Sequence, residues 1–249
     1  MKFFYLFILI FSASAAKSQT LNNFSLKDIG QSMLVVTDGT GKTVNMGLDM
    51  ENYGSPFFDT EFYPADITLI SGQRYENVLV KINLLSNEII FKSDDGKELA
   101  ILPAIQSLLL HKNGTPFLFE YGYPVFEKQN GKTIYQVLEK GEINLLKYYF
   151  VQVTEAKPYS SATMLRTIEK FPKLFVYNKN IGLKKAPKSN EDVAEIFKVE
   201  NEKLTKIIES NKLKIKKEDD LIKCIQQFNQ QTKNSSLKLF SFYNVSNYF

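Results

Sequence analysis

The chain has 249 residues, 44% of them apolar and 13% aromatic, which is a globular composition with enough apolar residues for one large core or two smaller ones. One cysteine, Cys224, and one histidine, His111, exclude an intrachain disulfide and leave few combinations for a metal or nucleophilic site. The formal net charge of +4 is unevenly divided, because residues 157–249 hold 18 Lys and Arg against 10 Asp and Glu.

The first 16 residues are typical of a cleavable secretory signal. A basic start at Lys2 precedes nine apolar residues from Phe3 to Phe11, and small residues follow at 12–16. Nine apolar residues are about half of the roughly 20 that a membrane-spanning helix needs, and no later window is apolar enough to span. We therefore expect cleavage after Ala15 or Ala16. The mature protein is expected to be exported, as a periplasmic, envelope-associated or secreted protein with no transmembrane helix.

A β-rich domain is expected over residues 17–185. From about residue 33 the apolar residues alternate with other residues, as strands with one buried face require. Between the alternating segments lie dipeptides that favour tight hairpins: Asp38-Gly39, Ser71-Gly72, Asp95-Gly96, Asn113-Gly114 and Asn130-Gly131. The pattern predicts a mainly β fold, an antiparallel meander that is sandwich- or barrel-like.

A C-terminal α-helical hairpin is expected over residues 189–231. Ser189 and Asp192 have the spacing of a capping box, and a helical apolar stripe of about five turns follows. A second helix is expected from about Lys217, because three acids precede its apolar stripe and favour the helix dipole. Residues 232–249 are rich in Asn, Ser and aromatics and are expected to be a tail.

Three segments together resemble a family of small exported Bacteroidota proteins of unassigned function. They are Gly54-Ser55-Pro56-Phe57-Phe58 leading to Glu61-Phe62, the hairpin Gly72-Gln73-Arg74-Tyr75, and the run from Lys216 to Lys223. The resemblance extends from about Gly54 to Asn229. It implies a secreted or periplasmic β-rich protein with a C-terminal helical segment, and it supplies no catalytic residues.

The candidate ligand-binding residues lie in an aromatic segment, Tyr53 to Pro64, which holds five aromatic residues, two acids and two prolines. On an exposed loop, such rings would stack on a glycan or peptide and the carboxylates would accept hydrogen bonds. In a strand, the same rings would fill the core. The candidates are Tyr53, Phe57, Phe58, Asp59, Glu61 and Tyr63.

Other chemical motifs are incomplete. The Gly-Lys-Thr at residues 41–43 lacks the first glycine of a phosphate-binding loop, since Val36 stands there. No ligand pair has suitable spacing for zinc with His111, and no serine is marked as activated by it. Cys224 lies beside an apolar stripe, where a small buried residue is the ordinary interpretation. We therefore predict no catalytic residue, metal or cofactor.

The leading functional hypothesis is a non-catalytic exported binding or envelope-structural module, whose ligand is an unknown component of the envelope or the extracellular space. The alternative is a hydrolase of envelope or extracellular polymers, which would need two opposed carboxylates in a cleft or a serine with His111. The lysines of the C-terminal region alternate with acids at helical spacing. They allow a peripheral contact with the envelope, and we expect no nucleic-acid partner.

Overall fold

The computed structural model describes residues 35–37, 43–45, 50–93, 96–101, 104–159 and 163–245. Two compact units are present, Met1–Gly47 and Leu48–Phe249. The expected signal at residues 1–16 lies outside the described residues. In the first unit, β1 (Val35–Thr37) pairs with β2 (Thr43–Asn45) in an antiparallel hairpin, and the Asp38-Gly39 turn between them is also outside the described residues.

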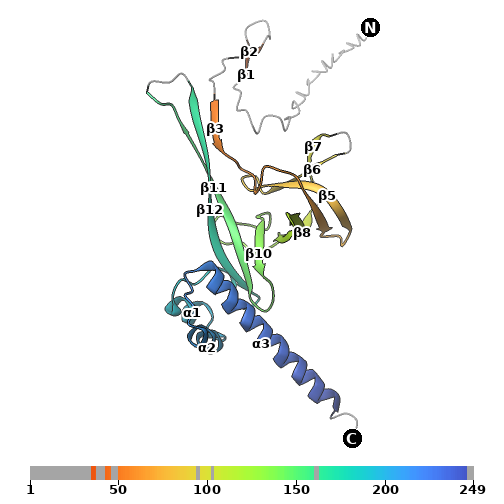
Figure 1. The fold of residues 1–249 in the computed structure, drawn as a ribbon, viewed down its shortest axis with the longest axis vertical. Coiled ribbons are helices and arrows are strands. Elements are labelled where there is room, and N and C mark those ends of the chain that lie inside the picture. Colours follow the sequence, from red (N-terminus) through yellow and green to blue (C-terminus); the bar gives the residue numbers. More distant parts are fainter. Residues whose placement is uncertain are drawn as a thin grey trace, which may run out of the picture. The chain divides into compact units, whose positions relative to one another are not determined.

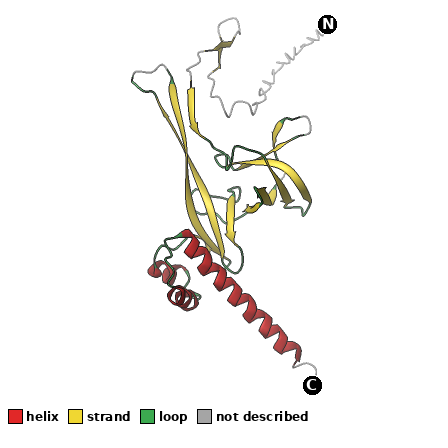
Figure 2. Ribbon diagram, in the orientation of Figure 1, coloured by secondary structure: helices red, strands yellow, loops and turns green. Residues whose placement is uncertain are grey.

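The second unit contains an 11-stranded sheet followed by helices (Figures 1 and 2). Its strands are β3 (Met50–Gly54), β4 (Tyr63–Leu69), β5 (Arg74–Asn83), β6 (Glu88–Lys92), β7 (Glu98–Ala100), β8 (Ile105–Lys112), β9 (Thr115–Glu120), β10 (Tyr135–Glu139), β11 (Asn144–Ala156), β12 (Met164–Asn178) and β13 (Gly182–Lys185). All neighbouring strands are antiparallel except β3, which pairs in parallel with β12. The expected mainly β fold with C-terminal helices is confirmed.

Strands β4 to β8 form a curled sheet. The spatial order is β8-β4-β5-β6-β7, so four strand spacings, about 19 Å in a flat sheet, would separate β7 from β8. Residues 101–104 connect them, and the five steps from Ala100 to Ile105 span at most about 18 Å, less than that separation. Backbone hydrogen bonds join this connection to the neighbouring strands at both of its ends. The Ile101 N–H donates to the Ile89 carbonyl, and the Ala104 carbonyl accepts from the Ile70 N–H. The strands must therefore curl.

A long hairpin of β11 and β12 links the curled strands to the helices. The two strands pair continuously from Asn144↔Tyr177 to Ala156↔Leu165. The middle of the hairpin contributes Val151 to the core of the curled strands. One end contributes Leu145 and Val176 to a core shared with the helices. Sheet and helices in this unit thus share buried side chains across the expected boundary at residues 185–189.

Three helices follow the sheet: α1 (Asn190–Ile196), α2 (Asn201–Asn211) and α3 (Glu218–Val245). The capping box is confirmed, since Ser189 Oγ accepts from the Asp192 N–H and the Asp192 carboxylate accepts from the Ser189 N–H. The expected five-turn helix is divided into α1 and α2 between Phe197 and Glu200. Buried Phe197 ends α1 and anchors the break in the shared core.

Helix α3 corrects the expectation of a tail from residue 232, because it continues to Val245. Residues 232–245 contain no glycine or proline, and a helix already nucleated on a packed face propagates through such a sequence at little cost. Within the part of the chain that the structure describes, no helix combines the length and apolarity needed to cross a membrane.

Candidate functional site

The aromatic segment leaves β3 and reaches β4 by passing along β5. Its backbone is held there in an antiparallel bridge between Phe57 and Asn83, with Phe58 N–H donating to the Ile82 carbonyl and Leu84 N–H donating to the Pro56 carbonyl, both at 2.9 Å. The segment starts at Gly54, whose φ of +85° suits glycine and whose absent Cβ lets the Ile168 carbonyl approach. This anchoring fixes the direction of each following side chain.

Phe58 is a core residue. Because successive residues of an extended segment point to opposite faces, Phe57 and Phe58 separate. Phe58 packs edge-on against three rings, with centroid distances of 5.5 Å to Phe117, 5.1 Å to Phe119 and 5.7 Å to Tyr149. It joins the apolar cluster of the curled strands, as expected if the rings of this segment fill the core.

Phe57 and Phe62 lie on either side of a lysine. The ammonium of Lys81 is 4.5 Å from the Phe57 ring centroid and 4.7 Å from the Phe62 centroid, and it forms a 2.7 Å ion pair with Glu98. The Lys81 side chain is only 11% exposed. Both ring faces thus stabilise a nearly buried cation, and neither face is free to stack on a ligand at that point.

Asp59 forms the polar centre of the segment. Its Oδ2 accepts a short hydrogen bond from Lys112 and one of 3.3 Å from the Tyr63 hydroxyl, while Oδ1 accepts from the Glu61 N–H at 3.2 Å. The hydrogen bond from Lys112 holds the pKa of Asp59 below its usual value, and the same bond raises the pKa of Lys112. Side-chain exposures of 22% for Asp59 and 29% for Lys112 leave the pair accessible to solvent.

The end of a tight turn positions Lys112. Asn113 and Gly114 have φ of 50° and 79°, and Lys112 pairs directly with Thr115, which is the two-residue hairpin that the Asn-Gly dipeptide predicts. The Lys112 ammonium also lies 5.7 Å from the Phe58 centroid and 5.6 Å from the Tyr63 centroid. It therefore sits where the aromatic core meets the solvent.

A second lysine, Lys170 of β12, reaches the same place. Its ammonium donates to the Phe57 carbonyl at 2.7 Å. Partial burial lowers the pKa of Lys170; repulsion from Lys112 acts in the same direction, and attraction to Asp59 opposes it. Lys170 thus lies near enough to Lys112 and Asp59 for both charges to act on it. We call Asp59, Tyr63, Lys112 and Lys170 the Asp59 cluster.

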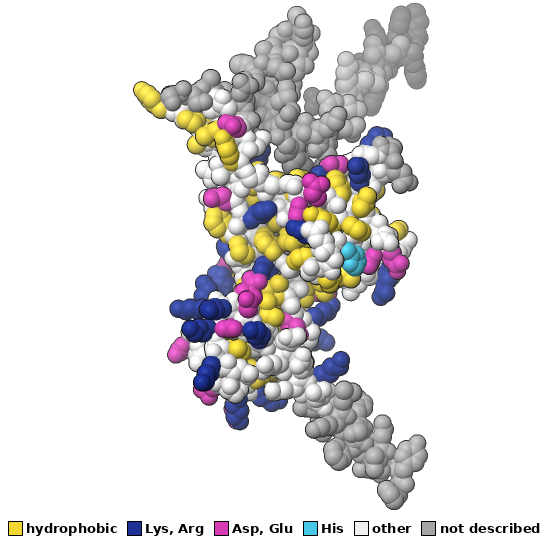
Figure 3. Space-filling model, in the orientation of Figure 1, with side chains coloured by type: hydrophobic (Ala, Val, Ile, Leu, Met, Phe, Trp, Pro, Cys, Tyr) yellow, Lys and Arg dark blue, Asp and Glu magenta, His cyan; other side chains and the backbone are white. Residues whose placement is uncertain are grey.

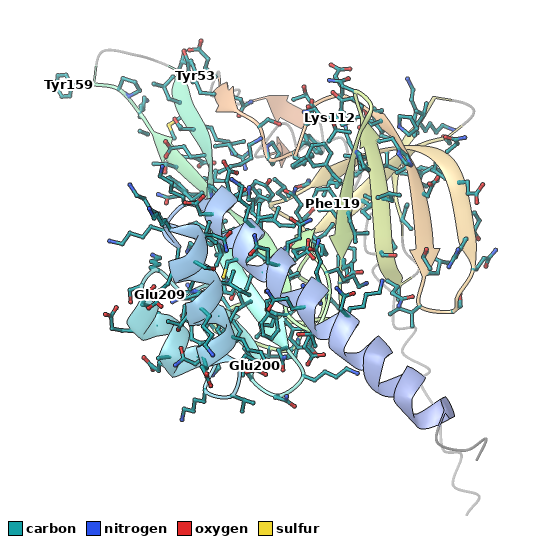
Figure 4. The ribbon with its side chains drawn as sticks, turned by 60° about the horizontal axis from the view of Figure 1, so that its bottom comes forward. Tyr53, Lys112, Phe119, Tyr159, Glu200 and Glu209 are labelled. Atoms are coloured by element: carbon teal, nitrogen blue, oxygen red, sulfur yellow. The ribbon has the colours of Figure 1, made fainter. Side chains whose placement is uncertain are left out.

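The six candidates from the sequence have different positions. Phe58, Asp59 and Tyr63 meet around Lys112, whereas Phe57 belongs to the Lys81 contact. Tyr53 is 51% exposed on β3, and Figure 4 shows it well separated from Lys112. The Glu61 side chain is exposed. Burial and Asp59 raise the pKa of Tyr63, and the Glu61 carboxylate adds to these effects. The sequence did not indicate the three lysines, because strand pairing alone brings them to the segment.

His111 and Cys224 have ordinary structural surroundings. His111, the cyan side chain in Figure 3, lies at the surface. Its Nε2 is 3.0 Å from Asp66 Oδ2 on the neighbouring strand, and among the described residues it makes no hydrogen bond with a serine, threonine or cysteine. Cys224 is 2% exposed in the core shared with the helices, and burial raises the pKa of its thiol to about 11. Within the described ranges, no three His, Cys, Asp or Glu side chains are grouped as metal ligands.

Comparisons with known proteins add no relative: no protein family, curated protein or solved structure matches this chain.

Proposed function

We propose that the protein is an exported, non-catalytic binding module and that the Asp59 cluster binds an acidic glycan. The observation that carries this proposal is that Lys112 bonds to the Asp59 carboxylate while the Lys170 ammonium bonds to the neighbouring Phe57 carbonyl, near enough to both charges to be influenced by them. Both ammonium groups lie at the edge of an aromatic core, with the Asp59 carboxylate between strands and the exposed Glu61 carboxylate near Tyr63. A ligand carboxylate would accept a charge-assisted hydrogen bond from Lys170.

The neighbouring groups suit a sugar. The Tyr63 ring is partly exposed and its hydroxyl, which donates to Asp59, keeps lone pairs that can accept from a sugar hydroxyl. An aromatic ring with a polar tip is suited to a ligand that has both apolar faces and hydroxyl groups. A glycan that contains uronic acid supplies both the carboxylate and the hydroxylated ring. The hydrolase alternative has no comparable observation in its favour.

Binding should be tested with a uronic-acid oligosaccharide and a neutral oligosaccharide of equal length, by titration calorimetry. We expect the acidic ligand alone to bind, and Lys170→Met to weaken binding roughly tenfold, as expected for a charge-assisted contact. Lys128→Met is the matched control, because Lys128 is exposed and distant in sequence from the cluster. Equal binding of both oligosaccharides, or equal loss in the two variants, would contradict the proposed site.

Export is tested separately. The mature protein should begin at Ala16 or Lys17, as the charge and apolar pattern of the first 16 residues predicts. Mass spectrometry of protein recovered from outside the cytoplasm measures this directly. An intact N-terminus from Met1 in that fraction would contradict a cleavable signal without bearing on the glycan site.

A further inference from the structure

A lysine-lined pocket lies between the start of α1 and the connection from α2 to α3. It has a volume of about 380 Å³ and is lined by Lys188, Ser189, Asn190, Lys214, Lys216 and Lys217, with Ile215 among its apolar residues. This volume is within the range of small-ligand sites. Ile215 is 6% exposed and belongs to the shared core, so one wall of the pocket is fixed by packing.

The four lysines differ from most of the cations that the structure places near carboxylates. Lys81, Lys112 and Lys147 each form an ion pair. In contrast, none of the four pocket ammonium groups forms an ion pair with a described residue, and all four side chains are exposed. Within the described chain, their charges are therefore screened mainly by solvent and salt.

The nearest carboxylates in the chain are used for other bonds. Asp192 Oδ2 accepts the backbone N–H groups of Lys188 and Ser189, at 2.7 and 3.2 Å. Asp220 Oδ2 accepts the backbone N–H of Lys214 at 2.9 Å. These bonds hold the pocket backbone in place and direct each carboxylate at the main chain.

The remaining acids near the pocket also form no ion pair with its four lysines. Glu218 accepts a hydrogen bond from Lys147 of β11, outside the pocket. Glu191 and Asp219 are exposed and form no ion pair with the four lysines. Figure 3 shows Lys and Arg side chains gathered on this helical part of the molecule. The four lysine side chains thus remain without an ion-pair partner among the described carboxylates nearby.

We propose that this pocket binds a phosphate group, in addition to and independently of the glycan site. Four flexible lysines that line one small cavity suit a multiply charged, compact anion better than a single carboxylate, because each ammonium group is a point charge that can approach a separate oxygen. The Ser189 hydroxyl and the Asn190 amide can donate further hydrogen bonds. The phosphate belongs either to a soluble compound or to a lipid headgroup.

Two probes distinguish the sources. Inorganic tripolyphosphate is titrated into the full mature chain at low salt, and co-sedimentation is measured with phosphatidylcholine vesicles with and without phosphatidic acid. Binding of tripolyphosphate alone identifies a soluble ligand. Binding to the phosphatidic-acid vesicles, with or without tripolyphosphate binding, identifies a headgroup site. Binding to neither probe would overturn the proposal.

Charge-matched variants test the location. Lys214→Gln with Lys216→Gln should weaken binding of the effective probe roughly tenfold, since two exposed charge contacts are lost. Lys203→Gln with Lys223→Gln removes the same charge from exposed positions on α2 and α3 that do not line the pocket, and it should change binding less than twofold. Equal losses in the two double variants would overturn the pocket and leave only attraction to overall charge. Circular dichroism confirms that both variants fold.

Discussion

The side-chain amide of Asn229 in α3 forms two hydrogen bonds with the backbone of Ile143 in the β10–β11 connection, in the way that a neighbouring strand would. Its Oδ1 accepts the Ile143 N–H at 3.0 Å and its Nδ2 donates to the Ile143 carbonyl at 2.9 Å. Ile143 is fully buried and Asn229 is 8% exposed. One side-chain amide therefore satisfies two buried backbone groups and ties the last helix to the sheet.

Replacing Asn229 by alanine should lower the free energy of unfolding by about 3 kcal/mol. The change leaves a buried N–H and a buried carbonyl of Ile143 without partners, and each such loss costs about 1–3 kcal/mol. Urea unfolding measures the difference. Gln230→Ala is the control, because Gln230 is the exposed neighbour on α3, and it should change stability by less than about 0.5 kcal/mol. Similar effects of the two changes would contradict the role of the Asn229 amide.

Gly141→Ala should also destabilise the protein, by about 1–3 kcal/mol. A Cβ at Gly141 would overlap the amide group of Asn229, which is held by its bonds to Ile143. Gly131→Ala is the matched control, because a Cβ there meets nothing within 4 Å. The overlap predicts that Gly141→Ala and Asn229→Ala together cost less than the sum of the single changes. Additive effects in thermal unfolding would show that the two sites are independent.

The buried thiol of Cys224 should make stability fall at alkaline pH. Burial raises the pKa of Cys224 from 9.0 to about 11 in the folded state. The stabilisation is therefore complete below pH 9.0 and decreases as pH rises towards 11, because the unfolded chain releases the proton first. The slope contributed by this group approaches about 1.4 kcal/mol per pH unit.

Cys224→Ala should flatten that alkaline decrease, measured by urea unfolding between neutral pH and pH 11. Buried tyrosines contribute a common background, since burial raises the pKa of Tyr149 to about 12, so the slopes of the two proteins are compared rather than their absolute stabilities. Identical slopes would mean that the Cys224 thiol ionises equally in folded and unfolded chains.

The Asp59–Lys112 pair should stabilise the protein most at neutral pH. The pKa of Asp59 is lowered, chiefly by its hydrogen bond from Lys112, so the contribution is present above the ordinary value of 3.8 and is lost as pH falls through the lowered pKa. A double-mutant cycle with Asp59→Asn and Lys112→Met should give a coupling of up to about 1 kcal/mol at pH 7. The coupling should vanish in acid.

Glu61→Gln provides the control for that cycle, because Glu61 is an exposed carboxylate of the same segment. Its effect on stability should be small at every pH. A coupling between Asp59 and Lys112 that persists unchanged below the pKa of Asp59 would show that the two side chains interact through packing instead of charge.

Local patterns in the sequence determined several strands, a tight turn and a helix cap of this protein, whereas Asn130-Gly131, expected in a tight hairpin, lies in the long connection between β9 and β10. Alternation at Val78, Val80 and Ile82 places them in β5, and the Asn113-Gly114 dipeptide forms the expected tight turn. Ser189 and Asp192 form the expected cap. These features depend on neighbours within a few residues, whose steric and hydrogen-bonding preferences act wherever the segment lies. Local patterns did not predict the helix over residues 232–245, because this stretch only continues α3, whose first turns are the part packed against the core.

The tertiary structure decided which distant residues meet. Lys112 reaches Asp59 from 53 positions away and Lys170 reaches Phe57 from 113 positions away, and no periodicity encodes either encounter. They depend on how strands β4 to β8 curl and on the register of the long β11–β12 hairpin. The curl and the register are set by burying the apolar faces of all these strands together. Ordering the chain in this way costs conformational entropy, which is offset only when the whole core has formed. The Asp59 cluster is a consequence of that closure.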